Sequence, residues 1–234
     1  MINKLQSLFP KHYRSGDILL INADCMDVMA VIGDKCVDLA IVDPPYGVKR
    51  DKGFSGFGGF GGFGKPIQRR QYKGEWDSET PKLEYFKTLL KVSKESIIWG
   101  GNFFTDKMPQ ANHWLFWDKI NTMPTFGDGE LAYTTFKRNS IKQITLEYNG
   151  LLGKENWRIH PTQKPIKLYD WLLHNYAKPG QTILDTHLGS GSSAIAAHYF
   201  GCVFIGVELD EDYFNASVER FKLATAQTDL MDFA

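Results

Sequence analysis

The chain has 234 residues, of which 43% are hydrophobic and 23% charged, and its formal net charge is zero. These values are typical of a globular protein with one core, and they exclude a basic surface over the whole chain. No apolar run is long enough to span a membrane, and the first residues, MINKLQSLFPKHYR, lack the apolar core of a signal peptide. We therefore expect a cytoplasmic protein. Its three cysteines (Cys25, Cys36 and Cys202) are expected to be reduced thiols without a metal or a disulfide.

Apolar runs and helical spacing predict strands that alternate with helices along the chain. Strands are predicted at 17–22, 37–42, 96–99, 113–117, 130–136, 141–148, 182–184 and 203–207. Helices are predicted at 26–32, 81–93, 166–177, 194–200 and 212–223. This alternation predicts an α/β fold with a doubly wound, mostly parallel sheet. No repeat or linker indicates a second domain, so residues 1–234 are expected to form a single domain.

The stretch 37–46, VDLAIVDPPY, combines a buried strand with an abrupt end. Pro44 and Pro45 lack an N–H and have a fixed φ, so they cannot continue a central strand. The turn places the carboxylate of Asp43 and the ring of Tyr46 just past the carboxyl end of a strand. Open α/β sheets bind their ligands there. The alternative is an ordinary Pro-Pro turn with a surface acid and a surface aromatic.

Residues 47–74 form a low-complexity segment in which glycine alternates with phenylalanine, and we expect a mobile loop. Its basic residues are Lys49, Arg50, Lys52, Lys65, Arg69, Arg70 and Lys73. Positive charge with interleaved aromatic rings suits a phosphate backbone and its bases. The alternative is a solvated loop with incidental charge. The position of the segment directly after Tyr46 favours a loop that closes over substrate.

The last third of the chain contains a strand, a glycine-rich turn, a helix and a second strand that ends at Glu208. Such a turn lets a ligand approach the amides of a helix N-terminus, and the acid can hold ribose hydroxyls. A turn made only for packing is the alternative. Asp185, just before the turn, would repel a pyrophosphate but suits a cationic amino group. An adenosine linked to an amino acid, as in S-adenosylmethionine, fits both ends.

With both motifs present, the chain resembles the amino-group DNA methyltransferases that use S-adenosylmethionine, in the circularly permuted order of the β group. Asp-Pro-Pro-Tyr comes early and the cofactor loop LDTHLGSGSS (184–193) comes late. The segment 160–165, HPTQKP, and the stretches WGGNFFTD, WLFWDK and GELAYTTF are also similar to blocks of the family, especially of small phage and mobile-element enzymes. Two departures are Asp-Thr-His, where Asp-Pro-Phe is commoner, and Ser192-Ser193 in place of a frequent Thr pair.

The resemblance implies a Rossmann-like methyltransferase domain with a role for each matching residue. Asp24 is expected to bind the adenine amino group and Glu208 the ribose. Asp185 and the turn 189–192 are expected to hold the methionine end, and Thr162 and Lys164 its carboxylate or the same loop. The full set expected to contact S-adenosylmethionine is Asp24, Cys25, Asp43, Thr162, Lys164, Asp185, Leu188, Gly189, Ser190, Gly191, Ser192, Glu208 and Leu209.

The catalytic residues implied are Asp43, Pro44, Pro45 and Tyr46. An exocyclic amino group is a poor nucleophile because its lone pair is delocalised into the ring. The Asp43 carboxylate and the Pro44 carbonyl can each accept one amino hydrogen and so free the lone pair. The two prolines fix these acceptors, and Tyr46 stacks on a base flipped out of the helix. No metal is required, because the cofactor is already a strong electrophile.

The expected substrate is DNA, double-stranded or single-stranded, with adenine N6 as the methylated atom, because Asp before Pro-Pro-Tyr goes more often with adenine. Cytosine N4, RNA adenine and a catalytically silent nucleic-acid-binding subunit are the alternatives. The interval 137–159 is too short for a separate target-recognition domain. Lys137 and Arg138 are expected to touch phosphates, which position the DNA without specifying its sequence. We therefore expect a short sequence preference or a partner specificity subunit, and a homodimer as a further alternative.

Overall fold

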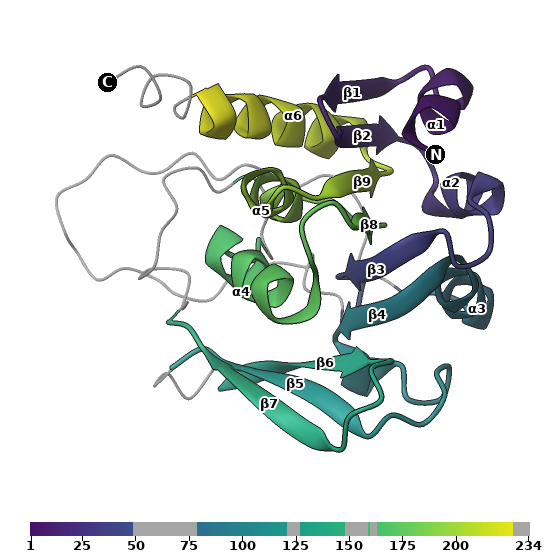
Figure 1. Ribbon diagram of the computed structural model, residues 1–234. Coiled ribbons are helices and arrows are strands. Elements are labelled where there is room, and N and C mark those ends of the chain that lie inside the picture. The colour runs from purple at the N-terminus through teal and green to yellow at the C-terminus, as the bar shows by residue number, and fades with distance from the viewer. Residues whose placement is uncertain (49–78, 121–126, 148–158, 160–162, 227–234) are drawn as a thin grey trace, which may run out of the picture.

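The computed structural model describes residues 1–48, 79–120, 127–147, 159 and 163–226. Its centre is a nine-stranded sheet in the order β1-β2-β9-β8-β3-β4-β6-β5-β7 (Figure 1). The strands are β1 (His12–Ser15), β2 (Ile18–Asn22), β3 (Val37–Val42), β4 (Ser93–Trp99), β5 (His113–Asp118), β6 (Gly129–Thr134), β7 (Ser140–Thr145), β8 (Thr182–Asp185) and β9 (Val203–Glu208).

The strands β2, β9, β8, β3 and β4 are parallel neighbours, and β1 and β6 are antiparallel to theirs. The prediction of a mostly parallel α/β sheet is confirmed. The chain runs from β8 to β9 on one side and from β3 to β4 on the other, so the sheet order reverses between β8 and β3. The carboxyl ends at such a switch point form the usual ligand crevice of open α/β sheets. Asp43 follows β3 there, and Asp185 ends β8.

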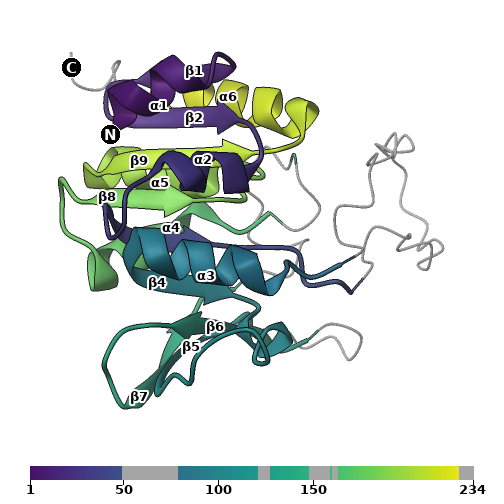
Figure 2. The same cartoon turned by 90° about the vertical axis from the view of Figure 1, so that its right-hand side faces the viewer.

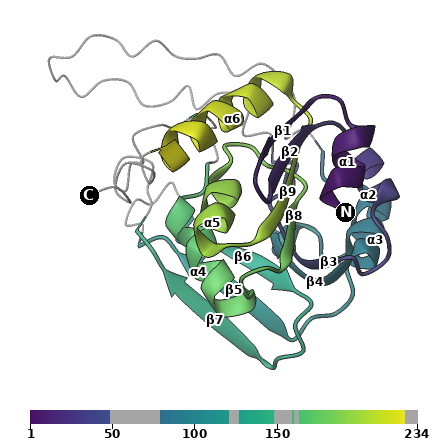
Figure 3. The same ribbon diagram turned by 45° about the horizontal axis from the view of Figure 1, so that its top comes forward.

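Helices cover both faces of the sheet, as a doubly wound fold requires (Figures 2 and 3). One face carries α1 (Ile2–Leu8), α2 (Cys25–Val31) and α3 (Leu83–Val92), and the other carries α4 (Ile166–Tyr176), α5 (Ser192–Phe200) and α6 (Glu211–Ala226). Each layer packs its buried apolar side chains against alternate residues of the strands. The site residues at the strand ends are therefore held by two separate hydrophobic clusters.

Three short elements were not predicted: α1, β1 and the 3₁₀ turn η1 (Gly101–Phe103). Helix α1 buries only Ile2 and Leu5, and β1 is a half-buried edge strand, so neither has strong apolar periodicity. The other predicted elements are present, with ends that differ by a few residues. β4 begins at Ser93, directly after α3, and β7 ends at Thr145. Residues 49–74 of the predicted basic loop lie outside the described part of the chain.

Among the described residues no helix is long and apolar enough to cross a membrane, and no cluster of His, Cys, Asp and Glu side chains is arranged to hold a metal ion.

Helix α3 offers a test of the packing. Phe86 is fully buried and contacts the rings of Tyr85 and Phe104, whereas Leu83 on the same helix is 45% exposed. We expect Phe86→Ala to lower the free energy of unfolding by about 3–5 kcal/mol, through lost burial and the cavity left behind. Leu83→Ala is the matched control and should change it by less than about 0.5 kcal/mol. Urea denaturation measures both, and equal effects would contradict the assigned faces of α3.

Candidate active site

A cavity of about 600 Å³ opens at the carboxyl ends of the central strands, at the switch point of the sheet. Its lining comes from the segments that follow β2, β3, β8 and β9 and from the start of α4. The acidic and basic side chains on its wall, apart from the neutral His187, are Asp24, Asp43, Lys164, Glu208, Asp210 and Glu211. The excess of carboxylates favours a cationic ligand over an anionic one.

The turn between β8 and α5 forms one wall of the cavity. Gly189 and Gly191 have φ values of +53° and +76°, which is the left-handed region that glycine adopts without strain. Gly191 caps the N-terminus of α5. A Cβ at Gly191 would lie 3.3 Å from the Cβ of Ser217 on α6. The predicted glycine turn is therefore required both by its backbone and by the packing of α6.

Asp185 lies below this turn and is almost fully buried. Its Oδ2 accepts a hydrogen bond from Ser193 Oγ (2.6 Å), and its Oδ1 accepts one from the amide of His187 (3.0 Å). Burial raises the pKa of Asp185 to about 7 despite these two donors. Asp185 thus supports the cavity wall from behind and responds to charge in the cavity.

Arg220 on α6 braces the same turn. Its Nη1 donates to the carbonyl of Ser190 (2.7 Å) and to Ser192 Oγ (2.9 Å), and its side chain is buried. Arg220 was not predicted as a site residue, because a single basic residue in a terminal amphipathic helix predicts only a solvated face.

The far end of the cavity carries Glu208 and Asp24. Glu208 Oε2 accepts from the amide of Gly189 (2.8 Å), and its Oε1 accepts from the amide of Asp210 (3.0 Å). Burial raises the pKa of Glu208 against these bonds. Asp24 caps α2, with its Oδ1 accepting from the amide of Met26 (2.8 Å). The strand that ends at Glu208 and the strand that precedes Asp24 are parallel neighbours.

Cys25 begins α2 beside Asp24 and also lines the cavity. Burial, together with the nearby carboxylate of Asp24, raises the pKa of the Cys25 thiol to about 12. Cys25 therefore presents a neutral thiol to the cavity at physiological pH.

Thr186 and His187, which stand where Pro-Phe is commoner in the family, belong to a chain of hydrogen bonds. Tyr85 of α3 is buried, and its hydroxyl lies 2.7 Å from Thr186 Oγ1, which in turn lies 2.9 Å from His187 Nδ1. Burial lowers the pKa of His187 to about 4, so its ring is neutral near pH 7. Thr186 and His187 both line the cavity, and Tyr85 holds them in place from the other face of the sheet.

Asp43 is held between a cation and a phenol. Lys164 Nζ lies 2.5 Å from Asp43 Oδ2, and the hydroxyl of Tyr46 donates to Asp43 Oδ1 at 2.6 Å. Lys164 comes from the segment just before α4 and is only 5% exposed. Lys164 was predicted to contact the carboxylate of the cofactor or the cofactor loop, but in the structure it pairs directly with Asp43.

The ring of Tyr46 fits against the segment after β4. It stacks on Phe103 with 5.0 Å between ring centroids and meets the edge of Phe104 at 6.1 Å. Gly100 has a φ of +69°, and a Cβ there would lie 2.2 Å from the Tyr46 ring. Gly100, the first glycine of WGGNFFTD, therefore makes room for the tyrosine of Asp-Pro-Pro-Tyr.

The structure brings most of the predicted site residues to one place. The cavity is lined by Asp24, Cys25, Asp43, Pro45, Lys164, Leu188, Gly189, Ser190, Glu208 and Leu209. Pro44, Tyr46, Asp185, Gly191 and Ser192 adjoin these residues in the chain but do not line the cavity. Predicted residues outside the described part of the chain are Thr162, Lys49, Arg50, Lys65, Arg69, Arg70 and Lys73.

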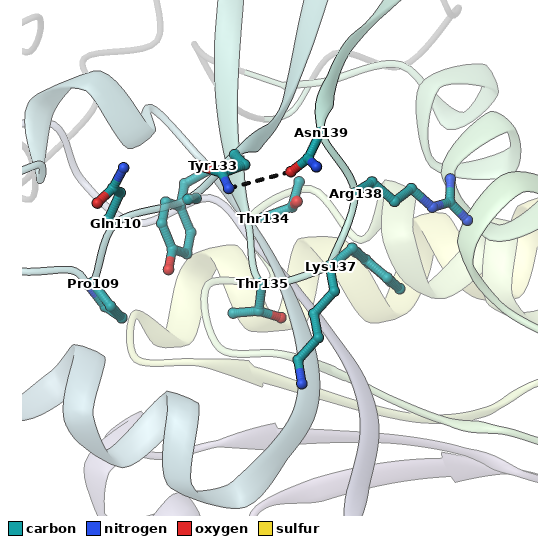
Figure 4. Close-up of a pocket in the computed structure, with 11 residues that line it drawn as sticks. Pro109, Gln110, Tyr133, Thr134, Thr135, Lys137, Arg138 and Asn139 are labelled. Atoms are coloured by element: carbon teal, nitrogen blue, oxygen red, sulfur yellow. Dashed lines mark hydrogen bonds between the residues drawn. The ribbon is translucent and has the colours of Figure 1, made fainter.

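Lys137 and Arg138 do not join this site. They lie between the end of β6 and the start of β7, in a separate pocket of about 450 Å³ (Figure 4). Because β6 is antiparallel to β4 and β5, this pocket is at the amino ends of the parallel strands, opposite Asp43. The Arg138 guanidinium lies over the ring of Tyr176, 5.1 Å from its centroid. This placement does not support the predicted contact of Lys137 and Arg138 with DNA at the active site.

Comparisons with known proteins agree with the geometry. A family model described as DNA methylase matches residues 98–219, more than half of the chain. The type II methyltransferase M2.DpnII of Streptococcus pneumoniae is 24% identical over 254 residues, covering 90% of this chain and 92% of that protein. The putative methylase YubD of Escherichia coli (strain K12) is 28% identical over 215 residues, covering 86% and 88%.

Two solved structures share the fold. The M1.HpyAVI–SAM complex has a TM-score of 0.57 at 19% identity and covers 86% of this chain and 97% of its own. PvuII DNA methyltransferase (cytosine-N4-specific) has a TM-score of 0.62 at 12% identity, with coverages of 91% and 90%.

The doubly wound sheet, with an acidic cavity at its switch point, is a Rossmann-like fold that PvuII DNA methyltransferase shares. The chain belongs to the DNA methylase family, whose enzymes depend on S-adenosylmethionine. Asp43 to Tyr46 lie before the matched residues 98–219, so their role is argued from position and geometry.

The contact between Gly100 and Tyr46 can be tested with a matched pair of glycine variants. Gly100→Ala and Gly180→Ala both place a Cβ at positive φ, but only Gly100 faces a neighbouring ring, since nothing lies within 4 Å of a Cβ at Gly180. We expect each variant to lose about 1–2 kcal/mol of stability from the backbone alone. Gly100→Ala should also lower methyl transfer about 100-fold by moving Tyr46. Equal activities of the two variants in a methyl-transfer assay would contradict this contact.

The raised pKa of Asp185 predicts a pH-dependent stability. A carboxyl group whose pKa rises on folding binds its proton more tightly in the folded state, so its ionisation destabilises the fold as pH rises from about 4 to about 7. The full effect is up to about 4 kcal/mol. The pKa of His187 is lowered in the folded state, so its protonation destabilises the fold as pH falls. The measured quantity is therefore the difference in unfolding free energy between wild type and Asp185→Asn. This difference should move in favour of the variant as pH rises, and a constant difference from pH 5 to 8 would refute the assignment.

Proposed function

We propose that this protein transfers a methyl group from S-adenosylmethionine to the exocyclic N6 of adenine in DNA, acting on a base flipped out of the helix. One observation carries the proposal: Asp43 shares a single cavity with Asp24, Glu208 and the glycine turn. A cofactor held by the turn and the two acids would therefore extend toward the carboxylate of Asp-Pro-Pro-Tyr.

The residues present fit S-adenosylmethionine. Glu208 and Asp24 offer carboxylate oxygens where ribose and adenine hydrogen-bond donors would lie, and Gly189 leaves the turn free of a side chain. The carboxylates on the wall suit the positive charge of the cofactor and disfavour a pyrophosphate. When bound, the cofactor supplies an electrophilic methyl group.

Asp43 is placed to accept a hydrogen from the target amino group. Lys164 holds Oδ2, which fixes the plane of the carboxylate. Oδ1 accepts from Tyr46, and because a carboxylate oxygen has two lone-pair sites it can accept a second hydrogen bond. The amino nitrogen loses one proton as it gains the methyl group, and Asp43 is the carboxylate placed to receive it. The Pro44 carbonyl, fixed by the two prolines, would accept the other amino hydrogen.

Tyr46 and Phe103 provide an aromatic surface beside Asp43. Their rings are stacked, and Phe103 is 39% exposed. A flipped base needs such a surface, because it loses its stacking in the duplex. We propose that it stacks on this pair, which would present its amino group to Asp43.

Adenine is favoured over cytosine because Asp43, rather than a serine, precedes Pro-Pro-Tyr; cytosine N4 is the alternative. We also propose that residues 1–234 form one catalytic domain and that the basic residues of 49–73 contact the DNA backbone. With only residues 137–159 available for target recognition, sequence preference would be short or supplied by a partner subunit or a second copy.

The decisive experiment measures methylated nucleosides. Purified protein is incubated with S-adenosylmethionine and mixed-sequence duplex or single-stranded DNA, which is then digested and analysed by mass spectrometry. We expect N6-methyladenine, and we expect Asp43→Asn to lower its rate at least about 100-fold with cofactor affinity retained. The matched control is Asp38→Asn, which changes the aspartate near the start of β3 at its pair with Lys94.

The other outcomes separate the alternatives. N4-methylcytosine would change the base while leaving the class and Asp43 in place. Cofactor binding without any methylated DNA base would instead favour RNA adenine methylation, tested with RNA in the same assay, or a catalytically silent subunit.

A further inference from the structure

We propose that Glu130 and Lys119 are positioning residues for methyl transfer: with Lys164 they complete a chain of alternating charges that fixes the carboxylate of Asp43. This inference rests on the proposed function, because it takes Asp43 as the group that accepts the amino hydrogen.

The chain of charges runs from the outer strands to the catalytic turn. Lys119 Nζ pairs with Glu130 Oε1. Glu130 Oε2 lies 3.1 Å from Lys164 Nζ, which lies 2.5 Å from Asp43 Oδ2. The side chains of Lys119, Glu130 and Asp43 are 20%, 17% and 17% exposed, and that of Lys164 is 5% exposed. Four charges thus balance one another with little access to water.

The ammonium group of Lys164 has all three of its hydrogens assigned. Its acceptors are Asp43 Oδ2, Glu130 Oε2 and the hydroxyl oxygen of Tyr46, the last at 3.2 Å. An ammonium group has only three donors, so these contacts fix its orientation completely. Its ring contacts support the same position, since Nζ lies 5.5 Å from the centroid of Trp99 and 5.7 Å from that of Tyr46.

The register of β6 brings Glu130 to this point. β6 is antiparallel to β4 and β5, so its first residues lie beside the carboxyl ends of those strands, near the catalytic turn. Glu130 pairs with Trp117, and Gly129 pairs with Asp118. A Cβ at Gly129 would lie 2.3 Å from the carbonyl oxygen of Trp117, so only glycine allows this close approach. The local structure therefore directs Glu130 to the site from a strand that the cavity does not touch.

The ionisation of Glu130 and of Lys164 depends on their charged neighbours. Although burial raises it, the ammonium groups of Lys164 and Lys119 bring the pKa of Glu130 down to about 2. Although burial lowers it, the carboxylates of Asp43 and Glu130 raise the pKa of Lys164 overall. The phenol of Tyr169 on α4 also lies near Asp43 and Glu130, and burial keeps its pKa well above the usual value. Glu130 and Lys164 are therefore both charged at physiological pH.

The consequence for the reaction concerns how strongly Lys164 binds Asp43. While Glu130 shares the ammonium group, Asp43 keeps part of its hydrogen-bonding capacity for the target amino group. Without the charge of Glu130, the only carboxylate paired with Lys164 would be that of Asp43, and Lys119 would lose its carboxylate partner. A buried charge that loses one partner is left partly uncompensated, and it interacts more strongly with the partners that remain. Both effects would shift the carboxylate from its productive position.

A purely structural role would be served at least as well by apolar side chains, because burying charges costs free energy that their attraction often only offsets. The chain of charges instead ends at Asp43 in the wall of the cavity. There, the free-energy cost of burying the charges serves to fix the carboxylate.

The test compares kcat with cofactor affinity in full-length variants. Glu130→Gln keeps the shape but removes the charge, and we expect kcat to fall about 100-fold while the dissociation constant of S-adenosylmethionine stays within threefold of wild type. Glu130→Asp restores the charge and should recover at least tenfold of this loss. Lys119→Met should lower kcat about tenfold. Glu219→Gln, which breaks the exposed pair of Glu219 with Lys222, is the matched control and should leave kcat unchanged.

Wild-type-like kcat in both Glu130→Gln and Lys119→Met would overturn this inference and leave the proposed function intact, provided that Asp43→Asn is inactive in the same assay. A fall in cofactor affinity by the same factor as kcat would also overturn it, because the residues would then act through general structure. If Glu130→Gln does not fold, Lys119→Met and Glu130→Asp decide by the same criteria. A wild-type protein that methylates no DNA base would instead refute the proposed function itself.

Discussion

The buried ammonium group of Lys164 is the interaction on which the arrangement of the site depends. It joins three parts of the chain that are far apart in sequence: the turn after β3, the start of β6 and the segment before α4. Desolvation of a charge is costly, so the group is stable only while its partners stay in place. The sheet must therefore hold β3 and β6 in fixed register, since a shift of one residue would turn Glu130 to the other face.

The order of the motifs along the chain matters less than the order of the strands in the sheet. Asp43 follows the third strand and Asp185 ends the eighth, yet the two strands are direct neighbours. Because all parallel strands present their carboxyl ends at one edge, any order that preserves the adjacency preserves the site. The same rule separates Lys137 and Arg138 from it: they follow an antiparallel strand, and they lie at the opposite edge although Glu130, on the same strand, reaches the catalytic turn.

Much of this structure was predictable from local sequence. Buried strands such as 37–42 are continuous apolar runs, and the glycine turn before α5 stands between a strand and a helix, so both have local patterns. Residues that act through long-range contacts were not predictable. Glu130 and Arg220 are single charged residues in elements whose local pattern indicates only a partly solvated face. Their roles depend on the antiparallel register of β6 and on the packing of α6 against the turn, and neither pairing has a local sequence pattern.

Two carboxyl groups near the cavity, one buried and one largely buried, show how partners decide ionisation. The pKa of Glu130 is about 2, because two ammonium groups outweigh its burial. The pKa of Asp185 is about 7, because a hydroxyl and an amide donate to it but no cation pairs with it among the described residues. The catalytic half of the site thus contains its own balancing charges, whereas the half around Asp185 and Glu208 has an excess of negative charge. A cationic ligand supplies the positive charge that this half of the site lacks. Its binding and the ionisation of Asp185 must therefore favour each other.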